Sequence, residues 1–252
     1  KKKRLSILIN NAGVALNSKD LTAKTTSDGN ELTMATNHLG PFLLTNLLLD
    51  YMIQTANIAG DGRIINISCS LHDHENHWST RGLDYLDTKN LQLTKDGTFN
   101  GLQAYKNSKL CNVLMAYSLA EKLKGTYVTV NAMDPGMVPT TQLMRYSSTL
   151  QRCMSVCCLH HTLRCFHFTK TPKKAAAEVV DLAINEKYEG KTGKYYIDGV
   201  EDRSSVESYD TDVQKTVWQL SAKLTGLRSS ADDDFDDISL GGPKTPLLEH
   251  KN

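Results

Sequence analysis

Apolar and polar residues alternate along the chain in blocks that predict strands separated by helices. Short apolar runs that lead into polar loops are typical of buried parallel strands, and they occur at 5–9, 63–67, 127–130 and 193–197. Apolar residues at helical spacing predict helices over 28–51, 102–124, 172–186 and 212–224. Because four strands alternate with helices, we expect an α/β fold with a Rossmann-like, doubly wound parallel sheet.

Proline and glycine mark the expected ends and bends of these helices. Pro172 stands near the first turn of one helix, where its missing N–H costs little, and Gly125 follows another helix where it should stop. Pro41 lies inside the helix predicted over 28–51, so a bend is expected there.

Two long stretches do not fit the alternation. The stretch 72–100 is polar, and its histidines His72, His74 and His77 are expected to face solvent. The stretch 140–168 is apolar and irregular. We expect it to form a lid over a substrate cleft, with 150–168 in peripheral contact with a membrane surface.

Cysteine and histidine recur at four-residue spacing within that apolar stretch, at Cys153, Cys157, His161 and Cys165. On a continuous helix the outer pair would lie about 18 Å apart, so one zinc ion could not bind all four side chains. Two of them could share an ion if the segment is not helical. We expect no metal site.

The composition is that of an ordinary globular protein. The chain has 252 residues, of which 40% are hydrophobic and 23% charged, and its formal net charge is +1, so nothing indicates binding to nucleic acid. The six cysteines lack the spacing of a disulfide scaffold and no secretory leader is recognised, which favours a reducing, intracellular compartment. No apolar run reaches the roughly 20 residues of a membrane-spanning helix. Residues 229–252 carry an acidic run, and we expect a disordered tail behind a domain over 1–228.

Tyr105 and Lys109 are four residues apart on a predicted helix, so their side chains lie on one face about one turn apart. A cation beside a phenol favours the phenolate, so Tyr105 could exchange a proton nearer neutral pH than its ordinary pKa of about 10. The same spacing is also found where a packed ring lies beside a solvated amine.

Four further blocks accompany this pair in a fixed order. Asn10-Asn-Ala-Gly13 ends one strand, Asn37-His-Leu-Gly40 lies in the next helix, Ile67-Ser-Cys-Ser70 ends the following strand, and Pro135-Gly136 ends another. From about residue 5 to 227 this order resembles the short-chain dehydrogenases/reductases. Within that family, the stretches 37–44, 104–112 and 192–196 look like the retinol-dehydrogenase-like branch.

The resemblance implies an oxidoreductase that moves a hydride between NADP(H) and a small hydrophobic alcohol or aldehyde, such as a retinoid. It implies Tyr105 as general acid/base, Lys109 as the residue that holds the nicotinamide ribose and lowers the Tyr105 pKa, and Asn37 as the residue that positions a water for proton relay. It also implies two groups of cofactor-binding residues, Asn10, Ala12 and Gly13 on the adenosine side, and Pro135, Gly136, Val138 and Thr140 on the nicotinamide and phosphate side. By the same resemblance, we expect a cytoplasmic or membrane-associated protein, at the endoplasmic reticulum.

One departure from the family affects the mechanism. The family's substrate-orienting serine aligns with Cys69, which lies between Ser68 and Ser70. A thiol is a weaker hydrogen-bond donor than a hydroxyl. Either Ser70 takes the role through a small adjustment at the strand end, which we slightly favour, or Tyr105 alone polarises the substrate carbonyl.

A second departure concerns the dinucleotide. The family's opening strand, its Thr-Gly-x-x-x-Gly-x-Gly turn and two further strands have no counterpart before Asn10. That turn normally binds the pyrophosphate, and a nearby residue selects the cofactor, so NADP is expected from the branch alone and NAD is the alternative. The competing hypothesis is a truncated, catalytically silent homologue that acts by binding, or an incomplete fragment. We expect no dehydrogenase activity from residues 1–252 alone, and the sequence leaves the oligomeric state open.

Overall fold

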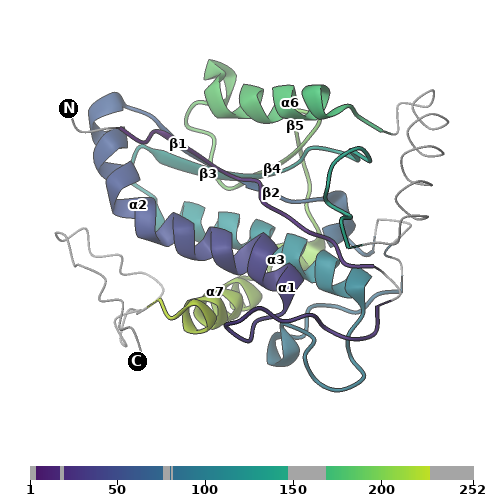
Figure 1. Ribbon diagram of the computed structural model, residues 1–252. Coiled ribbons are helices and arrows are strands. Elements are labelled where there is room, and N and C mark those ends of the chain that lie inside the picture. The colour runs from purple at the N-terminus through teal and green to yellow at the C-terminus, as the bar shows by residue number, and fades with distance from the viewer. Residues whose placement is uncertain (1–3, 18–19, 76–79, 81, 147–168, 228–252) are drawn as a thin grey trace.

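Five strands pair into one sheet in the order β1-β2-β3-β4-β5 (Figure 1). The structure is a computed structural model, and it describes residues 4–17, 20–75, 80, 82–146 and 169–227. The strands are β1 (Ile7–Asn10), β2 (Gly62–Ile67), β3 (Val128–Asp134), β4 (Lys194–Ile197) and β5 (Val200–Asp202). The first four are parallel, and β5 pairs antiparallel with β4. Every residue of β2 and β3 is buried, as expected for central strands that are covered on both faces.

Helices cover both faces of the sheet (Figure 1). Ile65 of β2 packs toward α6 on one face, whereas its neighbour Ile64 packs toward α2 and α3 on the other, as the alternation of side chains along a strand requires. α7 lies outside α2 and α3, where the rings of Trp218 and Phe42 are 4.9 Å apart. The helices are α1 (Leu32–Met34), α2 (Gly40–Ala59), α3 (Gly101–Lys122), α6 (Pro172–Ile184) and α7 (Thr211–Thr225). No helix in the described part of the chain is long and apolar enough to cross a lipid bilayer.

A π-helical turn, Ala35–Leu39, lies between α1 and α2 and contains Asn37. Pro41 explains why the helix changes its spacing here. A regular α-helix would need the N–H of residue 41 to bond the Asn37 carbonyl, and proline has no N–H to donate. A bend was expected at Pro41, and the structure has a local change of helix type directly before it. The helix also begins later and ends later than the range 28–51 that periodicity predicts.

The strand β5 was not expected from the sequence, because its three residues are all exposed and show no apolar pattern. It forms because Asp198 and Gly199 both have positive φ, at 54° and 75°, which is the geometry of a tight hairpin turn. The dipeptide Asp-Gly is a recognised signal for such a turn.

Two of the three histidines expected to face solvent are buried, so that expectation was wrong for His72 and His74. His72 lies between two loops that it bonds, and His74 packs edge-on against Tyr85 with ring centroids 4.5 Å apart. His77, the repeated cysteines and histidines of 153–165, most of the expected lid and the acidic tail lie outside the described residues.

Candidate active site

Tyr105 and Lys109 are buried side by side on α3, where the helix crosses the carboxyl end of β2. They are 6% and 3% exposed, respectively. The Lys109 ammonium donates to the carbonyl oxygen of Ile67, the last residue of β2, at 3.1 Å. Its Nζ atom lies 5.6 Å from the centre of the Tyr105 ring. The pair predicted from the sequence is therefore present at a strand end, where ligands of open α/β sheets bind.

Asn37 and Gly13 lie close to Tyr105 and Lys109. The Asn37 side chain accepts from Val14 N at 2.7 Å and donates to Val14 O at 2.9 Å and to Ser108 Oγ at 2.9 Å. A Cβ placed on Gly13 would lie 3.6 Å from Asn37 Oδ1 and 3.7 Å from Lys109 Nζ. Asn37 thus holds the loop after β1 against α3. Gly13 has no side chain that would contact the Lys109 amine.

The three residues at the end of β2 have different partners. Ser68 Oγ donates to the Lys109 carbonyl at 2.8 Å, so this hydroxyl is tied to the backbone of α3. The Cys69 thiol lies near enough to Tyr105 that each group shifts the pKa of the other. Ser70 starts a 3-10 turn, and its N–H donates to Asp134 Oδ2 at 2.7 Å. Of these three residues, Cys69 is the one whose side chain interacts with Tyr105, and the assignment of the substrate-orienting role to Ser70 stays a prediction.

The electrostatics differ from the expectation that Lys109 lowers the Tyr105 pKa. Burial raises the pKa of Tyr105 well above its ordinary value, and the neighbouring Cys69 and Asp134 raise it further. Burial, followed by Asp134, also raises the pKa of Cys69 to about 12. Burial lowers the pKa of Lys109 itself. The expected direction was wrong because desolvation of the phenolate is the largest effect and the interactions with Cys69 and Asp134 act in the same direction. Tyr105 is a protonated phenol at neutral pH.

The predicted cofactor residues of the first loop are only partly available. Asn10 is buried, and its amide donates to Thr45 Oγ1 at 2.9 Å and to Asn66 Oδ1 at 2.8 Å, so its side chain serves the core. Ala12 is exposed and Gly13 is half-buried. The Gly13 carbonyl accepts from Arg145 at 3.3 Å, and Leu143 O accepts from Ala15 N at 3.0 Å. The segment 143–145 therefore lies across this loop.

The second group of predicted cofactor residues follows β3 on the same edge of the sheet. Pro135, Gly136 and Val138 are half-buried and Thr140 is exposed. Gly136 has φ of 78°, and a Cβ there would come within 2.9 Å of Lys170 Cε. Only glycine meets both conditions without strain.

These residues fit the nicotinamide and ribose end of a dinucleotide. The buried Lys109 ammonium has three N–H groups, of which Ile67 O accepts one, so it has donors for ribose hydroxyls. Gly13 allows a close approach to its backbone, whereas the space beside Gly136 is occupied by Lys170. The Asn10 side chain does not fit a role in binding, because its amide is bonded within the core.

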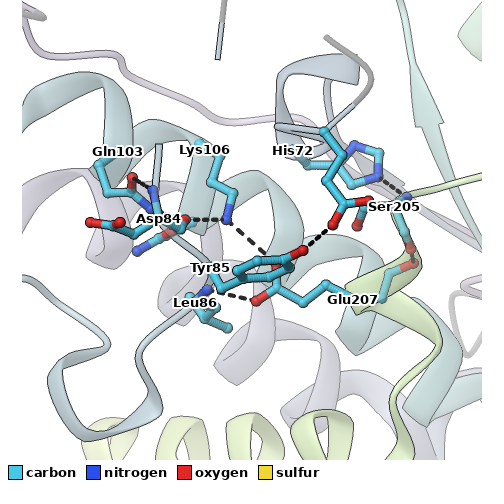
Figure 2. A network of polar contacts seen from close by, with 11 residues as sticks. His72, Asp84, Tyr85, Leu86, Gln103, Lys106, Ser205 and Glu207 are labelled. Atoms are coloured by element: carbon cyan, nitrogen blue, oxygen red, sulfur yellow. Dashed lines mark hydrogen bonds and ion pairs between the residues drawn. The ribbon is translucent and has the colours of Figure 1, made fainter. Parts of the chain in front are cut away.

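Sequence reasoning missed two buried residues of the site, Asp134 and His72. His72 Nδ1 bonds the Cys69 carbonyl at 2.7 Å, and its Nε2 accepts from Ser205 N at 3.0 Å, as Figure 2 shows for the latter. This pair of bonds fixes a neutral ring with the proton on Nδ1. Asp134 directly precedes the Pro135-Gly136 block and was not predicted as a site residue. A carboxylate at the end of a fully buried strand was the signal that could have identified it.

A second buried contact anchors the loop beside α3 (Figure 2). Lys106, adjacent to Tyr105, has a fully buried side chain and donates to Asp84 O at 3.0 Å. Its Nζ lies 3.4 Å from Glu207 Oε2, and Glu207 Oε1 in turn accepts from Leu86 N at 2.6 Å. The loop before α3 and the segment after β5 are thus joined beside α3.

The sequence is similar to that of known dehydrogenases. The family described as short chain dehydrogenase matches residues 1–79. Human retinol dehydrogenase 13 is 37% identical over 227 residues, covering 90% of this chain and 62% of that protein. The chloroplastic short-chain dehydrogenase TIC 32 B of Brassica napus is 36% identical, covering 87% and 63%, and polyprenol dehydrogenase of Danio rerio is 34% identical, covering 89% and 63%. The chain thus spans less than two thirds of the length of these relatives.

Solved structures show the same fold. A crystal structure of a protein from Mycobacterium paratuberculosis superposes with a TM-score of 0.61 at 22% identity, covering 88% of this chain and 68% of that one. The RhlG/NADP active-site complex of Pseudomonas aeruginosa superposes with a TM-score of 0.52 at 22% identity, covering 78% and 66%. These structures share the Rossmann-like fold of this chain. The chain belongs to the short-chain dehydrogenase/reductase family, in its retinol-dehydrogenase-like branch.

Proposed function

We propose that the chain carries the catalytic part of an oxidoreductase that transfers a hydride between NADP(H) and a hydrophobic alcohol or aldehyde. The observation that carries this proposal is the buried contact of Tyr105 with Lys109 and Cys69 at the carboxyl end of β2. Relatives named for retinol and for polyprenol support an apolar alcohol as the substrate class. NADP rather than NAD follows from the resemblance to the branch.

Tyr105 moves the proton of the reaction. In the reductive direction its hydroxyl protonates the carbonyl oxygen of the substrate, and in the oxidative direction the phenolate takes the proton of the alcohol. Its raised pKa keeps the proton-donating form present at neutral pH. The bound cofactor supplies or accepts the hydride.

Lys109 and Asn37 serve that proton transfer. Lys109 would hold the ribose hydroxyls through its remaining N–H groups. The side-chain amide of Asn37 is hydrogen-bonded to Val14 and Ser108. The group of Asn37 that would bind a relay water is therefore its backbone carbonyl. Pro41 supports this role, because it cannot close an α-helical hydrogen bond onto that carbonyl.

We further propose that the protein is associated with a membrane. An apolar substrate partitions into membranes, and the stretch 150–168 is the part of the sequence suited to peripheral membrane contact. Together with the resemblance to the branch, this supports an intracellular protein associated with the endoplasmic reticulum membrane.

The second candidate is a catalytically silent homologue that acts by binding. Two observations favour it, namely Cys69 in the place of a serine hydroxyl and the Arg145 side chain on the Gly13 carbonyl. Both would weaken catalysis without disturbing the fold.

An assay with added cofactor separates the two candidates. The chain is fused behind the amino-terminal part of a relative, from its opening strand and glycine turn through the two strands that follow, and NADPH oxidation is followed with all-trans-retinal and with a medium-chain aldehyde. Turnover that prefers NADPH to NADH and apolar aldehydes to short ones supports the enzyme. Cofactor binding without turnover of any aldehyde supports the silent homologue.

A further inference from the structure

The last residue of β3, Asp134, carries a carboxylate that is held between two loops of the site. It is 4% exposed. Its Oδ2 accepts from Ser70 N at 2.7 Å and its Oδ1 accepts from Gly136 N at 2.7 Å. A buried carboxylate is costly unless it is hydrogen-bonded, and two charge-assisted bonds to N–H groups satisfy it. One side chain thus connects the loop after β2 with the turn after β3.

Ionisable groups from every neighbouring element face this carboxylate. Its charge acts on Cys69 and His72 of the loop after β2, on Tyr105 and Lys109 of α3, and on Tyr195 of β4. Lys109 is the cation of this set, and His72 is held neutral by its two hydrogen bonds. The negative charge is therefore placed beside the proton-carrying groups of the site.

We infer that Asp134 is a positioning residue for the reaction, which holds the Cys69 loop and the Gly136 turn around Tyr105 and keeps a negative charge near its hydroxyl. The inference deepens the proposed function and rests on it for the role of Tyr105. The claim about the charge of Asp134 does not need catalysis to be tested.

The sign of the effect follows from the neighbours. A nearby negative charge disfavours a phenolate or a thiolate, so Asp134 raises the pKa of both Tyr105 and Cys69. Removing the charge lowers both pKa values. Cys69 is therefore a chemical reporter, because only its thiolate reacts with an alkylating agent.

The test is the rate of alkylation of Cys69 by iodoacetamide at pH 8.5, read by mass spectrometry of its peptide. The chain of residues 1–252 is compared with its Asp134→Asn variant. We expect Cys69 to react about tenfold faster in the variant, the size expected for removing one close negative charge. Cys111 is the internal reference, because it is buried on α3 and its own pKa is raised by burial and by Glu207.

Three controls decide the outcome. Asp73→Asn removes a negative charge that acts on His72, and it should leave the Cys69 rate unchanged within about twofold. Asp134→Glu keeps the charge and should stay near the wild-type rate even where the two hydrogen bonds are weakened. Amide hydrogen exchange at Ser70 and Gly136 should be faster in Asp134→Asn, since both N–H groups lose a carboxylate acceptor.

Two results would overturn the inference. An equal rise for Cys69 and Cys111 in Asp134→Asn would show a general loosening of the fold, and an equally fast Cys69 in Asp134→Glu would show that charge is not the cause. In the fused protein, the reductive rate should decline as the pH rises and Tyr105 loses its proton. This decline should begin at a lower pH in Asp134→Asn than in the wild type. Absence of turnover would contradict the proposed function, while the alkylation result would still decide the effect of Asp134.

Discussion

Cys69 occupies the position at which the family resemblance expects a serine, and it lies near enough to Tyr105 that each group shifts the pKa of the other. Because a hydroxyl is the better donor, we expect Cys69→Ser to raise aldehyde turnover in the fused protein by roughly tenfold. Ser70→Ala should change the rate by less than about threefold, since the Ser70 group with a defined partner is its backbone N–H. A loss of 10² or more, as expected for an oxyanion donor, from Ser70→Ala would restore Ser70 to the role.

At this scale, the sequence predicted groups that lie close together along the chain. Tyr105 and Lys109 were found because helical spacing brings residues four apart onto one face. Asp134 and His72 were missed because their partners, Ser70 and Ser205, come from elements that only the folded sheet brings near. The direction of the Tyr105 pKa shift was also beyond the sequence, because it depends on burial.

At the scale of elements, His38 connects the π-helical turn to α3 and α7. Its ring bonds Asn112 Oδ1 at 3.3 Å and Ser221 Oγ at 2.8 Å, and it is 1% exposed. Burial lowers the pKa of His38 to about 4, against 6.5 as its ordinary value. In the unfolded chain this histidine is protonated below about pH 6.5, whereas in the folded chain it is protonated only below about pH 4. The free energy of unfolding therefore decreases as the pH falls from 6.5 to about 4.

We expect the free energy of unfolding to decrease by about 2 kcal/mol from pH 7 to pH 5 because of this histidine. His38→Gln replaces the imidazole with an amide, which can form hydrogen bonds but does not titrate in this pH range. Urea unfolding at both pH values should show a smaller loss for His38→Gln than for the wild type, by about that amount. Equal losses in the two proteins would mean that His38 is protonated in the folded state as easily as in the unfolded one.

Most elements were predictable because apolar periodicity is strong in buried strands and in helices such as α3 and α7. The exposed hairpin strand β5 has no such pattern, and it depends on the positive φ of Asp198 and Gly199. The π-helical turn at Asn37 is a consequence of Pro41, which the sequence predicted only as a bend. Tertiary pairing and local hydrogen-bond competition set both features.

At the scale of the whole molecule, β1 is an edge strand of the sheet and its apolar side chains are accessible. Ile7 and Ile9 are 37% and 36% exposed. An uncovered apolar edge promotes association between chains. We expect the polypeptide of residues 1–252, expressed by itself, to associate and to bind NADPH weakly. Size-exclusion chromatography with fluorescence titration would contradict this if it gave a monomer with micromolar affinity for NADPH.

A charged side chain on that edge provides the matched variant. Ile9→Lys should shift the elution toward the monomer, because lysine on an edge strand opposes pairing. Ile184→Lys on the outer side of α6, where the side chain is 63% exposed, tests whether any added charge has this effect. Equal shifts for the two variants would mean that association does not occur through β1.

The central claim is that Tyr105 carries the proton of a hydride transfer, and Tyr105→Phe in the fused protein tests it most directly. Tyr117→Phe is the matched control, since it removes a hydroxyl from the same helix that bonds Ser204 at 2.6 Å and lies outside the catalytic pair. We expect kcat/KM for aldehyde reduction with NADPH to fall by about 10³ or more in Tyr105→Phe and by less than about threefold in Tyr117→Phe. Unchanged turnover in Tyr105→Phe would contradict the account.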